Sequence, residues 1–408
     1  MTDFQSSSDA AVYYKVQSAR GTQAANTGGQ VLRVAGGPGI KLAKAATQSN
    51  EIRSDGMMTR GRHGTQKTTS AYNGEMSLGS HDPILEAIVR STWDASVVSI
   101  TQADMTSVTT TANGIHASSG SWLAKGIRVG DVIRGANLSD AANNGKNLRV
   151  VGVTAADITV AETLVVNATP DTSFTITRPG KRLINTAPLI KRYFTLEEYE
   201  DIIVQSTVLN DFVWGSAKIS MAPNGLLTLD PGGTGTGQIQ GLPSNASPYF
   251  ISPSSVTGAP FSVVDATVRL GNRDMIELTA FDLTMNISPT APDTFGSGAI
   301  KYAPDVYTGQ MQVSMNITAL RKDLQYLIDF IAEQPYSLNI LAVDKASDPQ
   351  DFMAITVPNF TLGGVDPSAL SNKAGGRTQS ITIPAALCGV DTSATGDGAM
   401  IKFQTTAA

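Results

Sequence analysis

The sequence predicts a mainly β protein made of two tandem β-sandwich or barrel units, each with a flanking α-helix, and a small inserted β domain. Residues 72–78 (YNGEMSL) and 307–313 (YTGQMQV) share a tyrosine, a glycine and a methionine at the same spacing. Each stretch alternates as a strand does and leads toward an amphipathic helix. Between residues 97 and 180 the composition shifts to threonine, valine and asparagine in short alternating runs. These observations indicate two copies of one β unit, with a further β domain set into the first copy.

The first unit begins with a segment that lacks a core pattern. Residues 1–30 are rich in Ser, Ala, Gln and Gly, which predicts an N-terminal arm that orders only against a neighbouring molecule. The apolar runs 32–34 and 40–44 flank the glycine-rich turn 36–39 and predict two strands. Residues 47–70 are polar and basic, and a stretch of this length without apolar periodicity predicts an interface loop.

Two helices are predicted, one in each unit. Asp82-Pro83 is a typical helix start, and the apolar residues that follow repeat at helical spacing. The second helix covers residues 321–331 and also carries one apolar face. The apolar faces consist of Ile84, Leu85, Ile88 and Val89 in the first helix and Leu324, Leu327, Ile328 and Ile331 in the second.

The remaining segments complete the two units. The first unit resumes after the insertion with an alternating run at 191–201 and another at 212–221, and Asn224-Gly225 predicts a hairpin turn. Residues 231–260 are rich in Gly, Pro and Ser, which is typical of a long loop or linker. The predicted organisation is an arm (1–30), a first unit (31–96 and 181–235), an inserted β-barrel or sandwich (97–180), a linker (236–260) and a second unit (261–408).

Composition limits the classes of function. Charged residues make up 16% of the chain, low against a typical ~25%, which favours a protein that buries surface against other subunits. The net charge of −5 argues against a protein that grips DNA through its phosphates. The single cysteine, Cys388, excludes an intramolecular disulfide and fits a reducing cytosol. The polar N-terminus and the lack of a long apolar run predict neither a signal peptide nor a membrane span.

Few residues suggest chemistry, and we predict no enzyme, no metal site and no cofactor. The three histidines show no metal-ligand spacing, and the glycine-rich turn at 36–39 lacks the lysine of a phosphate loop. Acidic residues cluster on one predicted strand and favour a solvated or inter-subunit face over a calcium site. Basic residues cluster in the loop 47–70, without the interleaved aromatics of a nucleic-acid site. The acidic set is Glu197, Glu198, Glu200 and Asp201; the basic set is Arg53, Arg60, Arg62 and Lys67.

Three sets of residues carry a resemblance to a known family. They are 74–78 (GEMSL) with 82–87 (DPILEA), 193–198 (YFTLEE), and 212–215 (FVWG) with 218–220 (KIS). Together with the repeat in the second half, they make the chain similar to the major tail tube proteins of long, flexible-tailed (siphovirus-type) bacteriophages, in the large variants that carry two tube domains. The segment 97–180 lies outside the pattern and is expected to be an outward-facing decoration.

The resemblance implies a structural virion protein that is assembled in the host cytoplasm. Its units would join edge to edge into rings of three chains (pseudo-hexamers) or six, and the rings would stack head to tail into the conduit for DNA ejection. The implied partners are copies of the chain, the tape-measure protein, tail terminator and distal tail proteins, and genomic DNA that passes through without specific binding. In this arrangement the basic loop would contact the next ring, and the acidic strand would face the lumen.

Two alternatives remain open at this point. The inserted β domain could belong to a tail-associated protein that binds carbohydrate on the host surface. An enzyme acting on glycans could use a carboxylate pair such as Glu197 and Asp201, which would have to lie ~5–10 Å apart in a cleft.

Overall fold

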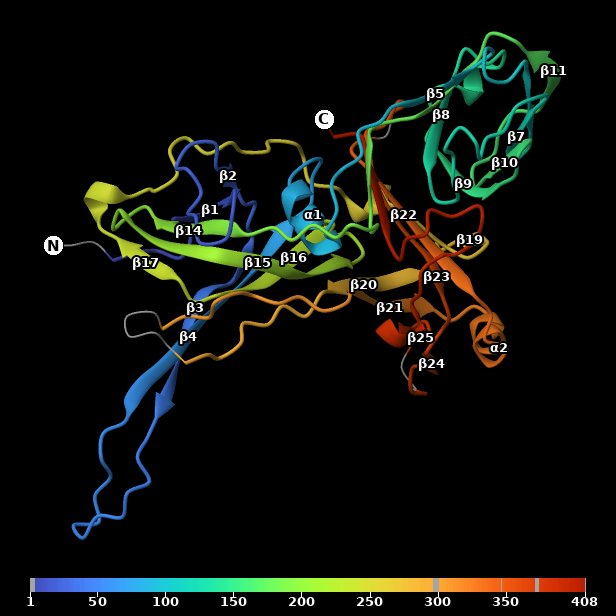
Figure 1. Cartoon of the computed structure of the whole chain (residues 1–408). Helices are drawn as coiled ribbons and strands as arrows, with labels where there is room; N and C mark the ends of the chain where they lie inside the picture. The colour runs from blue at the N-terminus through green and yellow to red at the C-terminus, as the bar shows by residue number, and fades with distance from the viewer. Residues whose placement is uncertain (1–3, 296–300, 346, 371–373, 408) are drawn as a thin grey trace.

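The computed structural model describes residues 4–295, 301–345, 347–370 and 374–407 (Figure 1). The strands of this part form three antiparallel sheets, accompanied by two short α-helices, so the prediction of a mainly β protein is confirmed. The first three residues of the predicted arm and the loop residues 296–300 lie outside the described residues.

The largest sheet has twelve strands and runs through both halves of the chain. Its main path is β2-β1-β14-β15-β20-β21-β25-β24, and β16 connects β15 to β4, which pairs in turn with β3. The strands are β1 (Ala10–Val16), β2 (Gln30–Val31), β3 (Gly36–Thr47), β4 (Arg62–Glu75), β14 (Phe194–Glu200), β15 (Gln205–Met221), β16 (Thr228–Gly235), β17 (Ile239–Leu242), β20 (Leu278–Asn286), β21 (Gln312–Leu320), β24 (Gly364–Pro367) and β25 (Thr378–Ile383).

A six-stranded sheet packs against this large sheet, and the two share one hydrophobic core. It contains β13 (Lys181–Ile184), β18 (Thr267–Leu270), β19 (Arg273–Asp274), β22 (Tyr336–Val343), β23 (Phe352–Phe360) and β26 (Lys402–Thr405). In the first half, Trp214 lies at the centre of an aromatic group, with the rings of Phe212, Phe194 and Tyr72 at centroid distances of 4.8, 6.3 and 6.3 Å.

The inserted segment folds as an eight-stranded sheet with a core of its own. In Figure 1 it stands apart from the body and is joined to it by two connecting segments. Its core residues all come from this segment and include Trp122, Phe174 and Ile133. The strands are β5 (Val98–Thr101), β6 (Val108–Thr111), β7 (Gly114–Ala117), β8 (Val132–Ala136), β9 (Leu148–Val153), β10 (Asp157–Val160), β11 (Asn167–Asp171) and β12 (Thr175–Arg178).

Helix α1 (Asp82–Val89) forms where it was predicted. The four apolar residues of its predicted face are completely buried, and Arg90, at φ 59°, ends the helix in the left-handed region. The helix cap is His81, however, and the Asp82 carboxylate pairs with Lys181 at 2.9 Å instead of capping the backbone.

Helix α2 (Gln325–Ile331) is shorter than predicted, and most of its predicted apolar face is exposed. Leu324, Ile328 and Ile331 are 53–75% exposed, and the only buried residue of the helix is Tyr326. The apolar face therefore points to solvent in a single chain. Helical spacing of apolar residues predicts a face suited to burial, but it does not predict which surface covers that face.

Two further expectations were also wrong. Within the predicted arm, residues 10–16 form β1, which pairs along its whole length with β14 of the same chain. The two copies of the repeated motif do not occupy similar positions. Residues 72–78 cover the end of β4 and the turn after it, whereas 307–313 lie mostly before β21. The match of seven residues was therefore not evidence for equivalent strands.

Candidate assembly surface

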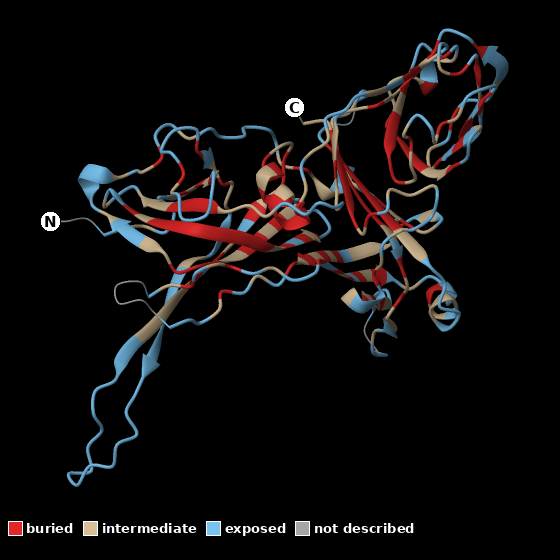
Figure 2. Cartoon of the chain, viewed as in Figure 1, coloured by how far each residue is buried: buried red, intermediate tan, exposed pale blue. Residues whose placement is uncertain are grey.

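A long exposed hairpin is the most prominent surface feature of the first half. Strands β3 and β4 pair with each other and project from the body as a two-stranded arm (Figure 1). Residues 48–61 at its tip are exposed, as the pale blue colour shows in Figure 2. Three apolar side chains lie there, with Ile52, Met57 and Met58 at 99, 70 and 73% exposure. A cluster of exposed apolar side chains on a projecting arm is typical of a surface that binds another molecule.

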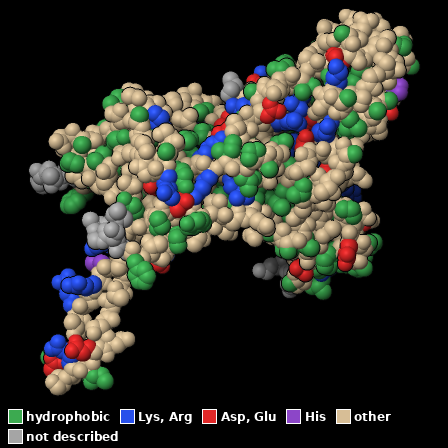
Figure 3. All heavy atoms as spheres, viewed as in Figure 1, with side chains coloured by type: hydrophobic (Ala, Val, Ile, Leu, Met, Phe, Trp, Pro, Cys, Tyr) green, Lys and Arg blue, Asp and Glu red, His purple; other side chains and the backbone are tan. Residues whose placement is uncertain are grey.

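The four basic residues predicted for an inter-ring contact lie along this arm, where Figure 3 shows Lys and Arg side chains in blue. Arg53 donates three hydrogen bonds of 2.5–3.2 Å to Asp55 at the tip, and Arg60 is exposed. Arg62 is the first residue of β4, and Lys67, near the root, forms a 3.0 Å ion pair with Asp293. The predicted loop 47–70 therefore consists of the hairpin tip and the first part of β4. It lacks an apolar stripe because the tip and the adjoining strand residues are exposed.

The four acidic residues predicted to face a lumen divide into two pairs. Glu197 has no exposed surface: its carboxylate accepts hydrogen bonds from the Ser206 hydroxyl (2.5 Å) and from the backbone N–H groups of Tyr249 (2.6 Å) and Phe250 (2.9 Å). It fixes the segment after β17 and is not at the surface of this chain. No local sequence signal marks this role, because two of the three donors, Tyr249 and Phe250, lie some fifty positions away in the chain.

Glu198 is half-buried and links two strands. Its Oε1 atom accepts hydrogen bonds from the Ile40 backbone N–H of β3 and from the Tyr72 hydroxyl of β4, both at 2.7 Å. Burial and the adjacent carboxylate raise the pKa of Tyr72. Of the predicted acidic group, Glu200 is half-buried and Asp201 exposed, both at the end of β14.

The two halves of the chain meet along a continuous strand pairing. The second half of β15 pairs antiparallel with β20, from Ser216 opposite Asn286 to Met221 opposite Phe281. On one face of this joint Ile219 and Leu283 are completely buried. On the other face Asp282 pairs with Lys218 at 3.0 Å and accepts a hydrogen bond from the Ser220 hydroxyl at 2.7 Å. The joint therefore combines backbone pairing with an apolar and a polar face.

The segment between β20 and β21 crosses back over the first half. Pro289 lies against Gly215, where an added Cβ would stand 2.1 Å from the proline ring. Farther along, Asp305 forms a 2.8 Å ion pair with Lys191 and accepts a 2.7 Å hydrogen bond from the Tyr193 hydroxyl. Burial acts to raise the pKa of Asp305, but these hydrogen bonds outweigh burial and lower the pKa.

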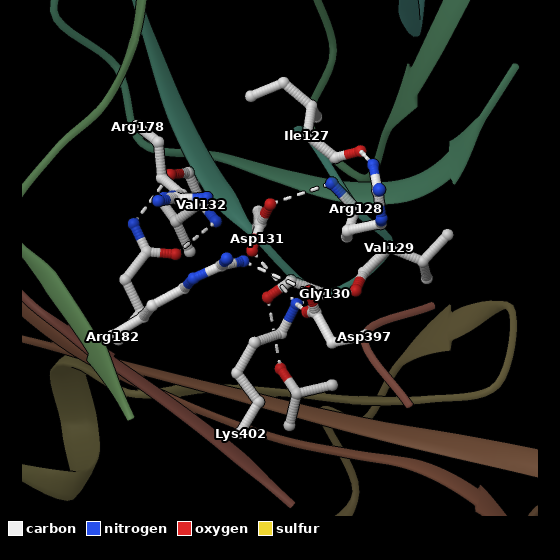
Figure 4. Close-up of polar contacts among 12 residues, drawn as sticks. Ile127, Arg128, Val129, Gly130, Asp131, Val132, Arg178, Arg182, Asp397 and Lys402 are labelled. Carbon is white, nitrogen blue, oxygen red and sulfur yellow. Dashed lines mark hydrogen bonds and ion pairs between the residues drawn. The ribbon is translucent and has the colours of Figure 1, made fainter. Parts of the chain in front are cut away.

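A buried ion cluster fixes the inserted sheet to the second half (Figure 4). The ammonium group of Lys402 on β26 lies 2.9 Å from the Asp131 carboxylate at the start of β8 and 2.5 Å from that of Asp397. It also donates a hydrogen bond to the Val129 carbonyl at 2.9 Å. Arg182 binds the other oxygen of Asp397 at 3.1 Å.

Apolar and amide contacts extend this interface. The Gln404 side chain accepts from the Val132 N–H and donates to the Val132 carbonyl, both at 2.8 Å. Val132 also packs with Leu341, Val343 and Phe352 of the second half. The inserted sheet, although set into the first half of the sequence, is therefore anchored on the second.

Other candidate chemistry is sparse in the part of the chain that the structure describes. No group of three or more His, Cys, Asp or Glu side chains there could hold a metal ion. His81 is buried and bonded to the Ser80 hydroxyl, and burial lowers its pKa to about 4. His116 pairs with Asp157 on the exposed side of the inserted sheet. Of the helices described, none is long and apolar enough to span a membrane.

The chain is a β-rich protein with an open sheet, a projecting arm and exposed apolar side chains, which are features suited to association with other molecules. The family model described as phage tail tube protein matches residues 7–385. The chain belongs to this family, as the sequence resemblance predicted. It is a non-enzymatic structural component of the phage tail, and so of the virion, and it self-assembles into the tube. A comparison with curated proteins found no match.

Proposed function

We propose that each chain supplies two tube units, that three chains close into a pseudo-hexameric ring, and that rings stack head to tail into the conduit for DNA ejection. The tape-measure protein, the tail terminator and the distal tail proteins are the partners proposed at the lumen and the two tube ends. DNA passes through the lumen without specific binding.

Strand pairing is the observation that carries this proposal, because the same pairings occur in both halves in the same chain order. In the first half β1 pairs with β2 and β14, and β15 pairs with β14 and β17. In the second half β18 pairs with β19 and β22, and β23 pairs with β22 and β26.

A second run of paired strands also repeats in the two halves. The order β3-β4-β16-β15 in the first half has its counterpart in β20-β21-β25-β24 in the second. The second half divides the counterpart of the long strand β15 into β23 and β24. Helix α1 follows β4 as α2 follows β21. On this basis the first unit runs from β1 to β17, with β5–β13 inserted, and the second runs from β18 to β26.

The arm is proposed to contact the next ring through its basic tip. Its counterpart in the second half, the β20–β21 segment, bonds to the first half of the same chain, as Asp305 does to Lys191. The root of the arm binds this segment through the Lys67–Asp293 ion pair, but residues 48–61 at the tip are exposed and available to another copy. Replacing residues 48–61 by a short turn should leave folded protein that does not stack; normal tubes from this variant would contradict the assignment. The control is Lys125→Ala, which removes a lysine of the inserted sheet, outside the arm, and should leave stacking unchanged.

The acidic residues at the end of β14 are proposed to face the lumen. Only Glu200 and Asp201 have the accessibility that this role needs, because Glu197 is buried and Glu198 is bonded to β3 and β4. Negative charge on a pore wall repels DNA phosphates and prevents adhesion. The inserted sheet, which stands away from the large sheet in Figure 1, is proposed as an outward decoration.

Electron microscopy of the concentrated protein tests the proposal. Hollow tubes with three-fold symmetry per ring are the expected result, with three inserted sheets around the circumference. Native mass spectrometry of the smallest closed ring gives the number of chains independently. Six chains per ring would refute the pseudo-hexamer, and discrete particles without a lumen at every concentration would refute the conduit.

A further inference from the structure

The β15–β20 pairing, which joins the two halves within one chain, has its counterparts in two strands at the ends of the same run of the sheet. In the first unit the second half of β15 lies between β16 on one side and β20 on the other. Its counterpart β24 pairs with β25 in the same way, but it ends the sheet, and on its other side no strand of the described residues pairs with it. Strand β3, the counterpart of β20, pairs with β4 alone among the described strands and is the other end of this run. Each chain thus carries the two complementary parts of one further joint.

We propose that β24 of one chain pairs antiparallel with β3 of a second copy, and so reproduces the β15–β20 joint between molecules. The inference rests on the proposed ring, and it names the two strands through which the ring closes. Unpaired edges offer a row of backbone donors and acceptors, and pairing with another copy satisfies them.

Backbone groups on both edges are available for this pairing, and Pro367 of β24 offers its carbonyl alone. The N–H of Ser368 donates a hydrogen bond to the Thr378 carbonyl on β25 at 2.8 Å. In an antiparallel ladder, successive residues point their backbone groups alternately to the two sides of the strand. The N–H and carbonyl of Val365, three positions earlier, therefore point away from β25 to the free side. On β3 the N–H of Ile40 already binds Glu198, so the free part of the edge begins at Lys41. The proposed pairing therefore uses the part of β3 beyond Ile40.

The polar faces of the two edges carry opposite charges. Asp366 lies opposite Ser380, on the face of β25 away from the buried Ile381. Lys41 lies opposite Thr69, on the corresponding face of β4, and both Asp366 and Lys41 are exposed. The inner joint has a similar ion pair with the signs exchanged, since the base is on β15 and the acid on β20.

The other faces are apolar. Val365 and Ile40 are half-buried and pack at the margin of the main core. Leu42, the next side chain on that face of β3, is 42% exposed. Pairing with a second copy would cover it, as Leu283 is covered in the inner joint.

Disulfide trapping tests the proposal. The full-length protein would carry Asp366→Cys with either Lys41→Cys or Ala43→Cys, two positions on the same face that allow for a shift in register. Side chains directly opposite each other in a sheet lie close enough for a disulfide. The matched control pairs Asp366→Cys with Leu42→Cys, which points to the opposite face. Single-cysteine variants test whether the native Cys388, which is buried, reacts.

Oxidation of assembled rings, followed by a non-reducing gel, should give linked chains with a position 41 or 43 cysteine and at least tenfold less with position 42. Two outcomes would overturn this inference and leave the proposed function intact. In both, rings or tubes are normal by electron microscopy; the chains either link at neither position 41 nor 43, or link equally with position 42. Failure of the unmodified protein to form any ring or tube would overturn both.

Discussion

Replacing Lys402 with methionine should release the inserted sheet from the second half without unfolding it. The lysine side chain is 5% exposed, and it lies between Asp131, which has no exposed surface, and Asp397, which is 8% exposed. Methionine keeps the apolar stem and removes the charge. Two buried carboxylates are then left with one fewer cation, and breaking a buried ion pair in this way costs about 3–5 kcal/mol.

The loss of free energy should weaken the contact between the inserted sheet and the second half. It should not unfold the inserted sheet, because that sheet has its own core around Trp122. Limited proteolysis at the connecting segments, where Val97 is 78% exposed, should be at least tenfold faster in the variant, and thermal unfolding should separate into two transitions. The control is Lys125→Met, which removes a 41% exposed lysine paired with Asp104 and should leave both proteolysis and thermal unfolding unchanged. Equal proteolysis of Lys402→Met and the unmodified protein would refute the reasoning.

Three further predictions concern pH and packing. Burial acts to raise the pKa of Asp397, but Lys402 and Arg182 outweigh burial and lower the pKa. The contact between the inserted sheet and the second half should therefore weaken as the pH falls below about 4, and limited proteolysis at a series of pH values would detect this. Burial lowers the pKa of His81 to about 4, so stability should decline by up to about 3 kcal/mol from pH 6.5 to 4, and denaturant titration of His81→Gln should show a flatter profile. Gly215→Ala should destabilise the protein by about 1–3 kcal/mol because its Cβ meets Pro289, whereas Gly241→Ala, with open space, should be neutral in the same titration.

Local signals predicted the elements that local chemistry determines. The Asp82-Pro83 start gave α1 its position, and Asn224-Gly225 lies at a turn, with Asn224 at φ 58°. The compositional shift at residue 97 marked a segment that forms its own sheet and core. These features depend on neighbours within a few positions, so the sequence pattern contains their cause.

Features that depend on distant partners were not predictable in this way. Glu197 looked like one member of an exposed acidic row, but its hydrogen-bond donors come from Ser206, Tyr249 and Phe250. The ion cluster at Lys402 joins residues more than 270 positions apart, and each looks like an ordinary surface charge in the sequence. The proposed repeat of the two halves rests on strand pairing, and the short motif that suggested it lies at non-equivalent positions.

The covalent connection between the two units has an energetic consequence for the proposed ring. Six separate units would form six joints between molecules, and each association costs about 4–15 kcal/mol in lost translational and rotational freedom. In a ring of three chains, half of the joints are the β15–β20 pairing, which forms when the chain folds. The other half need only the exposed edges β3 and β24. A protein of this design should therefore close rings at lower concentration than single-unit subunits with joints of equal strength. It also has two units that can diverge, and the projecting arm and the inserted sheet, each present in one unit alone, are the differences expected from that freedom.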